Sequence, residues 1–124
     1  MLEGFVPFPP EFAEKYRAKG YWEDQSLAQE FDVVFKRYAS RVALIDGGKV
    51  FTYEELDRAT TNLALELLEL GVQPLDRVVP TLPNTHEFVL LYFALQKLGA
   101  IPIAALDTHR YAEISQFVKL SGAT

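Results

Sequence analysis

Apolar residues recur every three or four positions in two stretches of the chain, which is the spacing of an amphipathic helix. In the first stretch they are Leu27, Phe31, Val34, Phe35 and Tyr38. In the second they are Leu56, Ala59, Leu63, Leu67 and Leu70. Each stretch opens with a capping box, at residues 26–29 and 52–55, in which the end residues satisfy each other's backbone N–H groups. The pattern therefore predicts two helices that each bury one face.

A third pattern, over residues 76–110, predicts a strand, a buried helix and a second strand. Residues 77–82 form a short valine-rich run, which Pro83 ends because proline cannot donate to a ladder. Residues 88–95 are apolar on every face, as in a buried helix. Residues 100–106 are apolar without alternation, which is typical of parallel strands covered on both faces. The short connections predict a right-handed βαβ unit.

Local signals also place the ends of this buried helix and of one more helix. Asn84, with Glu87 three residues later, predicts a capped start, and Gly99 predicts the end. After the second strand, Asp107 or Thr108 is expected to cap a last helix. The apolar positions of that helix are Ile114, Phe117, Val118 and Leu120.

The first 25 residues differ from the rest of the chain. Residues 5–10 are rich in proline and aromatic residues, which favours an extended arm. A short helix is expected over residues 11–19, with Pro10 in its first turn. Tyr21 and Trp22 are interpreted as an anchor that holds the arm on the domain. The predicted division is an arm of residues 1–25 and a partial α/β domain of residues 26–124.

The order of the elements predicts an α/β fold with an incomplete sheet. Val42–Asp46 and residues 50–52 flank Gly47-Gly48, a strong signal for a β-hairpin. The hairpin is followed by a Rossmann-like βαβα unit, after which a doubly wound sheet expects another strand. The chain is therefore interpreted as the front of a larger domain, truncated near Thr124. Such a piece is expected to expose a sheet edge through which it self-associates.

Composition narrows the classes of function. The chain has 124 residues, 49% of them hydrophobic, with a formal charge of −5 and no cysteine. The negative charge argues against a nucleic-acid or anionic-membrane surface, and the missing cysteines exclude disulfides and cysteine-based zinc sites. No signal peptide and no run long enough to cross a bilayer is visible, so a cytoplasmic location is expected.

His109 and Arg110 form the most informative polar pair. They follow the second predicted strand, at the edge where open α/β sheets bind ligands, and a guanidinium there can hold a phosphate or carboxylate. The alternative is a solvated helix start. The turn after the first strand has no glycine-rich loop and offers a phosphate only one helix N-terminus. His86 needs no special role there, and no metal site is predicted.

Several segments together resemble the N-terminal part of adenylate-forming enzymes, the superfamily of acyl- and aryl-CoA synthetases, luciferases and nonribosomal adenylation domains. They are FTYEELDRAT, LGVQPLDRVV, TLPNTHEFVLLYFALQKLGAIPIAAL and the following Glu113-Ile114. The resemblance runs from about Leu27 to the end of the chain and lies in the order and spacing of these segments. Pro80 departs from the pattern, and it marks the first strand as weakened or locally unpaired.

Two features are similar to the stand-alone ligases that adenylate 2,3-dihydroxybenzoate or salicylate. One is the leading arm PPEFAEKYRAKGYW, and the other is LDTHRYAEI, which resembles their Ser-His-Arg turn with Thr108 in place of serine. The resemblance implies that ATP and an aryl acid form an aryl-adenylate and pyrophosphate. The aryl group then passes to the phosphopantetheine thiol of an aryl carrier protein in siderophore assembly.

The resemblance also limits what this segment does. The family's phosphate loop, nucleotide motifs, aryl pocket and catalytic lysine have no matching positions here. ATP and Mg²⁺ are thus expected only in the full-length enzyme, no catalytic residue is assigned, and the segment alone is expected to be inactive. His109 and Arg110 match a region near the mouth of the thiol-donor tunnel in related CoA ligases. A fragment of an aryl- or acyl-CoA ligase and a non-catalytic α/β interaction module stay open as alternatives.

Overall fold

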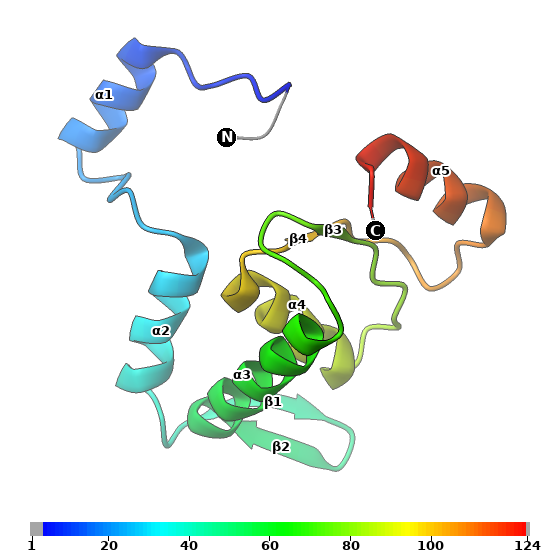
Figure 1. Cartoon of the computed structure of the whole chain (residues 1–124). Coiled ribbons are helices and arrows are strands. Elements are labelled where there is room, and N and C mark those ends of the chain that lie inside the picture. The colour runs from blue at the N-terminus through cyan, green and yellow to red at the C-terminus, as the bar shows by residue number, and fades with distance from the viewer. Residues whose placement is uncertain (1–3, 124) are drawn as a thin grey trace.

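The computed structural model describes residues 4–123, which form helices and two small sheets. The elements in order are α1 (Pro10–Ala18), α2 (Leu27–Arg37), β1 (Val42–Asp46), β2 (Lys49–Thr52), α3 (Tyr53–Glu69), β3 (Arg77–Val78), α4 (His86–Leu98), β4 (Ile101–Pro102) and α5 (Tyr111–Ser121) (Figure 1). The α/β fold with an incomplete sheet is confirmed. No helix among these residues has both the length and the apolar character that crossing a membrane requires.

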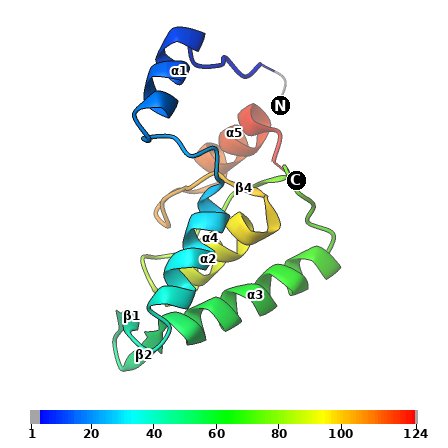
Figure 2. The same ribbon diagram turned by 90° about the vertical axis from the view of Figure 1, so that its left-hand side faces the viewer.

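The core lies where α2, α3 and α4 meet (Figure 2). It is built from small and aromatic side chains that interlock between the three helices. Phe93 of α4 packs edge-on against Phe31 and Phe35 of α2, with ring centroids 4.7 and 5.4 Å apart. Leu95 is fully buried and Leu56 of α3 is 3% exposed. Burying this apolar surface is the main source of stability for the three-helix region.

Both capping boxes are confirmed. The hydroxyl of Ser26 accepts the N–H of Gln29, whose side-chain oxygen accepts the N–H of Ser26 at 2.8 Å. At the start of α3, Thr52 and Glu55 exchange the same pair of bonds, at 3.2 and 2.9 Å. The backbone N–H of Thr52, followed by its hydroxyl, lowers the pKa of the Glu55 carboxyl. These two helices therefore begin where their own sequence specifies.

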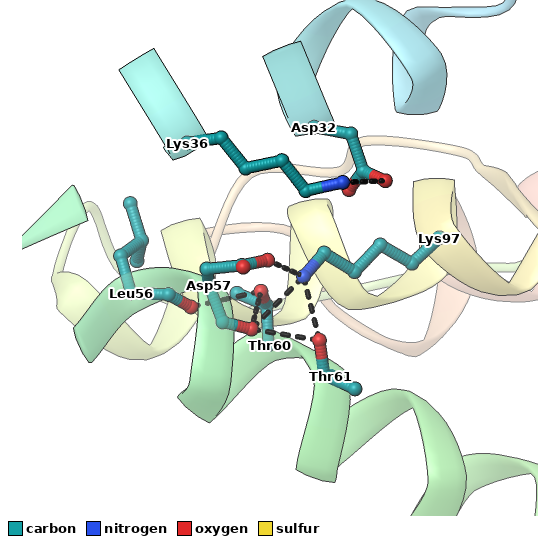
Figure 3. Close-up of polar contacts among 7 residues, drawn as sticks. All are labelled: Asp32, Lys36, Leu56, Asp57, Thr60, Thr61 and Lys97. Carbon is teal, nitrogen blue, oxygen red and sulfur yellow. Dashed lines mark hydrogen bonds and ion pairs between the residues drawn. The ribbon is translucent and has the colours of Figure 1, made fainter. Parts of the chain in front are cut away.

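A polar joint fastens α4 to α3. Lys97 extends from α4 and donates to the carboxylate of Asp57, to the Asp57 carbonyl at 2.9 Å and to the Thr61 hydroxyl at 2.7 Å (Figure 3). Its ammonium also lies 5.4 Å from the ring centroid of Phe35. The Lys97 side chain is only 14% exposed. Its ammonium therefore loses part of its hydration in the joint, and the ion pair with Asp57 offsets this cost.

The predicted strand–helix–strand order with parallel strands is confirmed, although both strands are shorter than predicted. β3 precedes α4 in the chain, β4 follows it, and the two strands pair in parallel. Beyond them, the N–H of Ile103 donates to the Val78 carbonyl at 2.8 Å, and the N–H of Ala105 donates to the Pro80 carbonyl at 3.3 Å. Residue 80 donates no hydrogen bond to the neighbouring strand in return, because proline has no N–H. Pro80 therefore accepts one bond but donates none, which weakens the strand at this position, the first of the two outcomes expected from the sequence.

Two predicted helix starts are wrong. The N-cap of α4 is Thr85 rather than Asn84, and the N-cap of α5 is Arg110 rather than Asp107 or Thr108. A turn closes before α5 begins, because the N–H of His109 donates to the carbonyl of Leu106 at 3.1 Å. The capping acceptor of α4 comes from a distant residue, described below.

Two predicted apolar faces are also less covered than expected. Leu70 is 82% exposed because it lies just past the end of α3, whereas Thr60 is fully buried and donates to the Leu56 carbonyl. Within residues 88–95, predicted to be buried on every side, only Ala94 and Leu95 are fully buried. α2 and α3 cover one side of α4, and the β3–β4 pair is too small a sheet to cover the rest.

The N-terminal arm lies apart from the α3–α4 pair in both views (Figures 1 and 2). Trp22 packs against Phe8 and Tyr16, with ring centroids 5.1 and 5.4 Å away, so these ring contacts lie within the arm and not, as predicted, between the arm and the domain. Arg17 and Asp24 add an ion pair at 2.9 Å. The division at residue 25 stays a prediction. Residues 1–3 of the predicted arm and Thr124 lie outside the described residues.

Candidate functional site

A mostly apolar cleft of about 280 Å³ opens where β3 and β4 end. Its walls are the loop after β3, the first turn of α4 and the segment after β4. The lining residues are Leu82, Asn84, Phe88, Ala104, Ala105, Leu106 and Asp107. The carboxyl ends of neighbouring strands are where open α/β sheets bind ligands. We call this hollow the carboxyl-edge cleft.

The lining residues explain both the space and the chemistry of the cleft. Ala104 and Ala105 have short side chains that leave room between the strand end and Phe88 of α4. Asn84 and Asp107 supply an amide and a carboxylate to an otherwise apolar lining. An apolar slot with a few placed polar groups suits a slender ligand with a few hydrogen-bonding groups.

The predicted residue His109 lies in the turn that continues the cleft wall beyond Leu106 and Asp107. Its Nδ1 accepts the backbone N–H of Leu106 at 3.1 Å. Its ring packs edge-on against Phe117 of α5, with centroids 5.1 Å apart. His109 therefore ties the turn both to the end of the strand segment and to the helix that follows.

Arg110, the other predicted residue, lies exposed at the end of the same turn. Its Nη1 donates to the carbonyls of Asp107 at 2.9 Å and His109 at 3.1 Å. Its backbone N–H donates to Glu113, and this bond is the largest cause of the lowered pKa of that carboxyl. The guanidinium has five N–H donors, and the bonds to these two carbonyls use one nitrogen. The turn thus holds a positive charge near the cleft rim.

A second polar cluster joins the hairpin to the first turn of α4, and we call it the hairpin brace. It consists of Asp46 and Lys49 from the hairpin and His86 and Glu87 from α4. Asp46 Oδ2 accepts the backbone N–H of His86 at 2.9 Å and lies 2.7 Å from its ring Nδ1. Glu87 lies 3.0 Å from the same Nδ1, and Lys49 Nζ lies 2.8 Å from Nε2. The His86 side chain is only 10% exposed.

The position of the ring hydrogen in the brace follows from its partners. A lysine ammonium only donates, so Nε2 of His86 accepts from Lys49 and Nδ1 carries the hydrogen. That hydrogen points to the carboxylates of Asp46 and Glu87. The backbone N–H of His86, followed by its ring, lowers the pKa of Asp46. The pKa of Glu87 is also lowered, chiefly by the Thr85 hydroxyl.

The described residues of the brace do not fit a metal ion as they stand. Asp46, His86 and Glu87 bring possible ligand atoms within 4.8 Å of one another. A cation on Nδ1 would force the ring hydrogen onto Nε2, where it would meet the ammonium of Lys49. The cluster already satisfies its polar atoms, so it acts as a structural link between hairpin and helix.

The start of α4 does not fit a phosphate either. Its first N–H donates to the carboxylate of Asp46, whose negative charge would repel the anion. The helix N-terminus that the sequence offers as a phosphate site is therefore occupied from within the chain. These described residues do not fit the phosphates of a nucleotide.

Sequence reasoning missed Asp46 and gave Asn84 and Asp107 the wrong role. The sequence marks Asp46 only as the end of a hairpin strand, and its link to His86 spans 40 positions, so no local pattern indicates it. The local pattern predicts Asn84 and Asp107 as helix caps, but the N-caps are Thr85 and Arg110, and both predicted residues line the cleft. Glu55 takes part in the capping box that the sequence predicts at the start of α3.

Comparison with known proteins gives a consistent result. The family model described as AMP-binding enzyme matches residues 31–124. Triostin synthetase I of Streptomyces triostinicus is 48% identical over 123 residues, and 2,3-dihydroxybenzoate-AMP ligase of Bacillus subtilis (strain 168) is 41% identical over 123 residues. Each alignment covers 99% of this chain and 23% of the relative. The chain therefore spans about a quarter of the length of these relatives.

The fold has a close counterpart among solved structures. The apo structure of MbtA from Mycobacterium smegmatis matches with a TM-score of 0.91 at 42% identity. The match covers 97% of this chain and 23% of that one. The similarity therefore includes the segments on both walls of the carboxyl-edge cleft.

Proposed function

The chain belongs to the family of AMP-binding enzymes, and on this premise we propose that it forms the N-terminal part of the large domain of an aryl-acid–AMP ligase. The observation that carries the proposal is the similarity of nearly the whole chain to 2,3-dihydroxybenzoate-AMP ligase. The proposed acid is 2,3-dihydroxybenzoate, with salicylate as the second candidate. Its carboxylate attacks the α-phosphorus of ATP, forms the aryl-adenylate and releases pyrophosphate.

In the second step, the thiol of a phosphopantetheine group on an aryl carrier protein attacks the aryl carbonyl. A thioester forms, the bond to AMP breaks and AMP leaves. ATP use follows from the family, and Mg²⁺ is proposed to neutralise charge on its phosphates. Because the described residues at the start of α4 do not fit a phosphate, both would be held by other segments of the enzyme. The 124 residues alone are proposed to be inactive scaffold.

Within this reaction, His109 and Arg110 are proposed to lie at the mouth of the path by which the thiol arm enters. Three observations support this role: the turn adjoins the cleft, the cleft is mostly apolar, and Arg110 places an exposed positive charge near its rim. A phosphopantetheine arm combines an aliphatic chain with amides and a phosphate. A guanidinium suits its phosphate end.

Free CoA is the second candidate acceptor, because it carries the same phosphopantetheine arm. The turn LDTHRYAEI favours the carrier protein, since it resembles the turn of the carrier-dependent ligases. A cytoplasmic location is proposed for the enzyme. We also propose that the isolated 124 residues self-associate, supported by the short β3–β4 sheet and by the exposed side chains of Leu106 and Leu120.

The test uses the full-length protein in two half-reactions. Pyrophosphate exchange into ATP is measured with 2,3-dihydroxybenzoate, salicylate, benzoate and hexanoate. Transfer is then followed by mass spectrometry with an aryl carrier protein and with free CoA. The proposal expects exchange with the hydroxybenzoates and transfer to the carrier. Exchange with hexanoate alone, or no exchange with any acid, would overturn it, and transfer to CoA alone would select the second acceptor.

A further inference from the structure

We propose that the hairpin brace is a positioning device for the carboxyl-edge cleft, with Asp46 as the residue that sets the cleft wall. The effect of the brace on the cleft concerns the folded chain alone and does not depend on the proposed function. Its consequence for transfer of the aryl group rests on the proposed function.

α4 lacks the local cap that α2 and α3 have. Its N-cap Thr85 makes no side-chain capping bond. Asp46 supplies the missing acceptor from the end of β1, at 2.9 Å from the His86 nitrogen. The first turn of α4 is therefore held by a residue of a different element, and removing that acceptor leaves the turn free to fray.

The helix geometry carries this anchor to the cleft. Successive residues of an α-helix are rotated by about 100°, so Phe88 lies about 200° around the axis from His86. His86 faces the hairpin, and Phe88 lines the cleft on the opposite side. Fixing His86 therefore fixes the rotation of the turn that presents Phe88. It also anchors the end of the loop that contributes Leu82 and Asn84 to the cleft.

The hairpin places both polar and aromatic side chains against His86. Asp46 and Lys49 are a directly opposed pair that flanks the Gly47-Gly48 turn, so both reach His86 from the same tight turn. Phe51 of β2 stacks on the His86 ring, with centroids 5.7 Å apart and planes 26° from parallel. Polar and apolar contacts thus converge on one buried side chain.

The opposite wall of the cleft does not depend on the hairpin. The turn after Leu106 is closed by His109 and Arg110 through bonds within the turn itself. The wall formed by the 82–85 loop and Phe88 is the one that the brace controls. Losing Asp46 should therefore move or loosen one wall while leaving the other in place.

Hydrogen exchange, measured by mass spectrometry on the full-length protein, tests the positioning directly. Asp46→Ala is expected to speed exchange of the peptide covering residues 82–88 by about fivefold, the typical effect of losing a helix cap. Asp46→Asn keeps an oxygen that accepts the His86 N–H and should restore most of the protection. Asp32→Ala removes an exposed carboxylate that lies 3.9 Å from Lys36, and it serves as the matched control with no expected change.

The same variants are assayed in both half-reactions. Asp46→Ala should lower kcat/KM for transfer to the thiol by about tenfold, because small displacements of a site wall are costly. Pyrophosphate exchange should change by less than about twofold. Asp46→Glu, which keeps the charge but moves the oxygen by one carbon, should give an intermediate loss and replaces Asp46→Ala if that variant does not fold.

The outcomes separate the two proposals. If hydrogen exchange at residues 82–88 is unchanged in Asp46→Ala, or in Asp46→Glu where that variant replaces it, the positioning role is overturned, whatever the two half-reactions show. Faster hydrogen exchange with an unchanged rate of aryl transfer overturns the functional consequence of the brace. Faster hydrogen exchange in an enzyme that adenylates no aryl acid supports the positioning role of the brace and contradicts the proposed function. Faster exchange with slower transfer, both restored by Asp46→Asn, supports both.

Discussion

The α3–α4 interface and the carboxyl edge are held in different ways. At the interface, Leu95 and Thr60 are fully buried and Lys97 is pinned by three hydrogen bonds. At the edge, α5 has no buried residue among those described, and Leu106 is 63% exposed. Regions with few buried contacts open most easily. Stability is thus concentrated in the interface, whereas the geometry of the edge depends on a few polar contacts.

α4 belongs to both regions, which is why they are not independent. Its C-terminal half carries Ala94, Leu95 and Lys97 into the packed interface. Its first turn carries Phe88 to the cleft and is held by Asp46. A change in the core should therefore destabilise the whole fold, and a change in the brace should act mainly on the cleft.

The largest effect is expected from Leu95→Ala. The side chain is fully buried, so the variant leaves a cavity and should lose about 2–5 kcal/mol of unfolding free energy. The measurement is denaturant unfolding of the protein followed by circular dichroism. Leu120→Ala is the matched control, because Leu120 of α5 is 76% exposed and should lose less than about 0.5 kcal/mol. Equal losses of unfolding free energy in the two variants would show that stability is not concentrated in the α3–α4 interface.

The next effect sharpens the role of the polar joint. Lys97→Met keeps the length of the side chain but removes the ammonium that Asp57 and Thr61 accept from. A loss of about 1.5–3 kcal/mol is expected, as for hydrogen bonds to charged groups. Asp57→Asn and the double variant complete a double-mutant cycle in chemical denaturation. Additive losses would show that the two side chains are not coupled, contrary to the contacts in Figure 3.

A smaller effect is expected at the locally capped start of α3. Thr52→Ala removes the hydroxyl that accepts the Glu55 N–H and should cost about 1 kcal/mol. Thermal unfolding of this variant is compared with Thr108→Ala, an exposed threonine in the turn before α5. If Thr108→Ala is the more destabilising of the two, the packed region is not where stability is concentrated.

The smallest effect is a pH dependence shared by both regions. The pKa values of Asp46, Glu55 and Glu113 are all lowered by bonds from backbone N–H groups. Their stabilisation is therefore fully present above the ordinary carboxyl pKa of about 4. It is lost as pH falls through the lowered values. The melting temperature should fall from pH 5 to pH 2.5, and less steeply in Asp46→Asn. If the melting temperature of Asp46→Asn falls with pH as steeply as that of the wild type, Asp46 does not contribute to the pH dependence.

What the sequence predicts follows the same division. The starts of α2 and α3 and the hairpin are predicted because their signals lie within four residues of each other. The start of α4 is mispredicted because Asp46 lies 40 positions away. The strand lengths are overestimated because the apolar runs continue past Pro80, which the sequence marks as a weak point and which lacks the N–H that pairing requires. The sequence places His109 and Arg110 after the second strand of the βαβ unit, and their role stays a prediction, whereas the cleft beside them becomes visible only in the tertiary structure.

The most direct test of the division between scaffold and site is Arg110→Ala in the full-length enzyme, assayed in both half-reactions with Lys119→Ala as the control. Both residues are exposed cations on or next to α5, but only Arg110 belongs to the turn at the cleft. The expected result is a loss of about tenfold in kcat/KM for transfer to the carrier thiol, as for removing one charge-assisted contact. Aryl-adenylate formation should stay normal. Transfer at the wild-type rate in Arg110→Ala, with normal adenylation, would contradict the role given to the carboxyl edge.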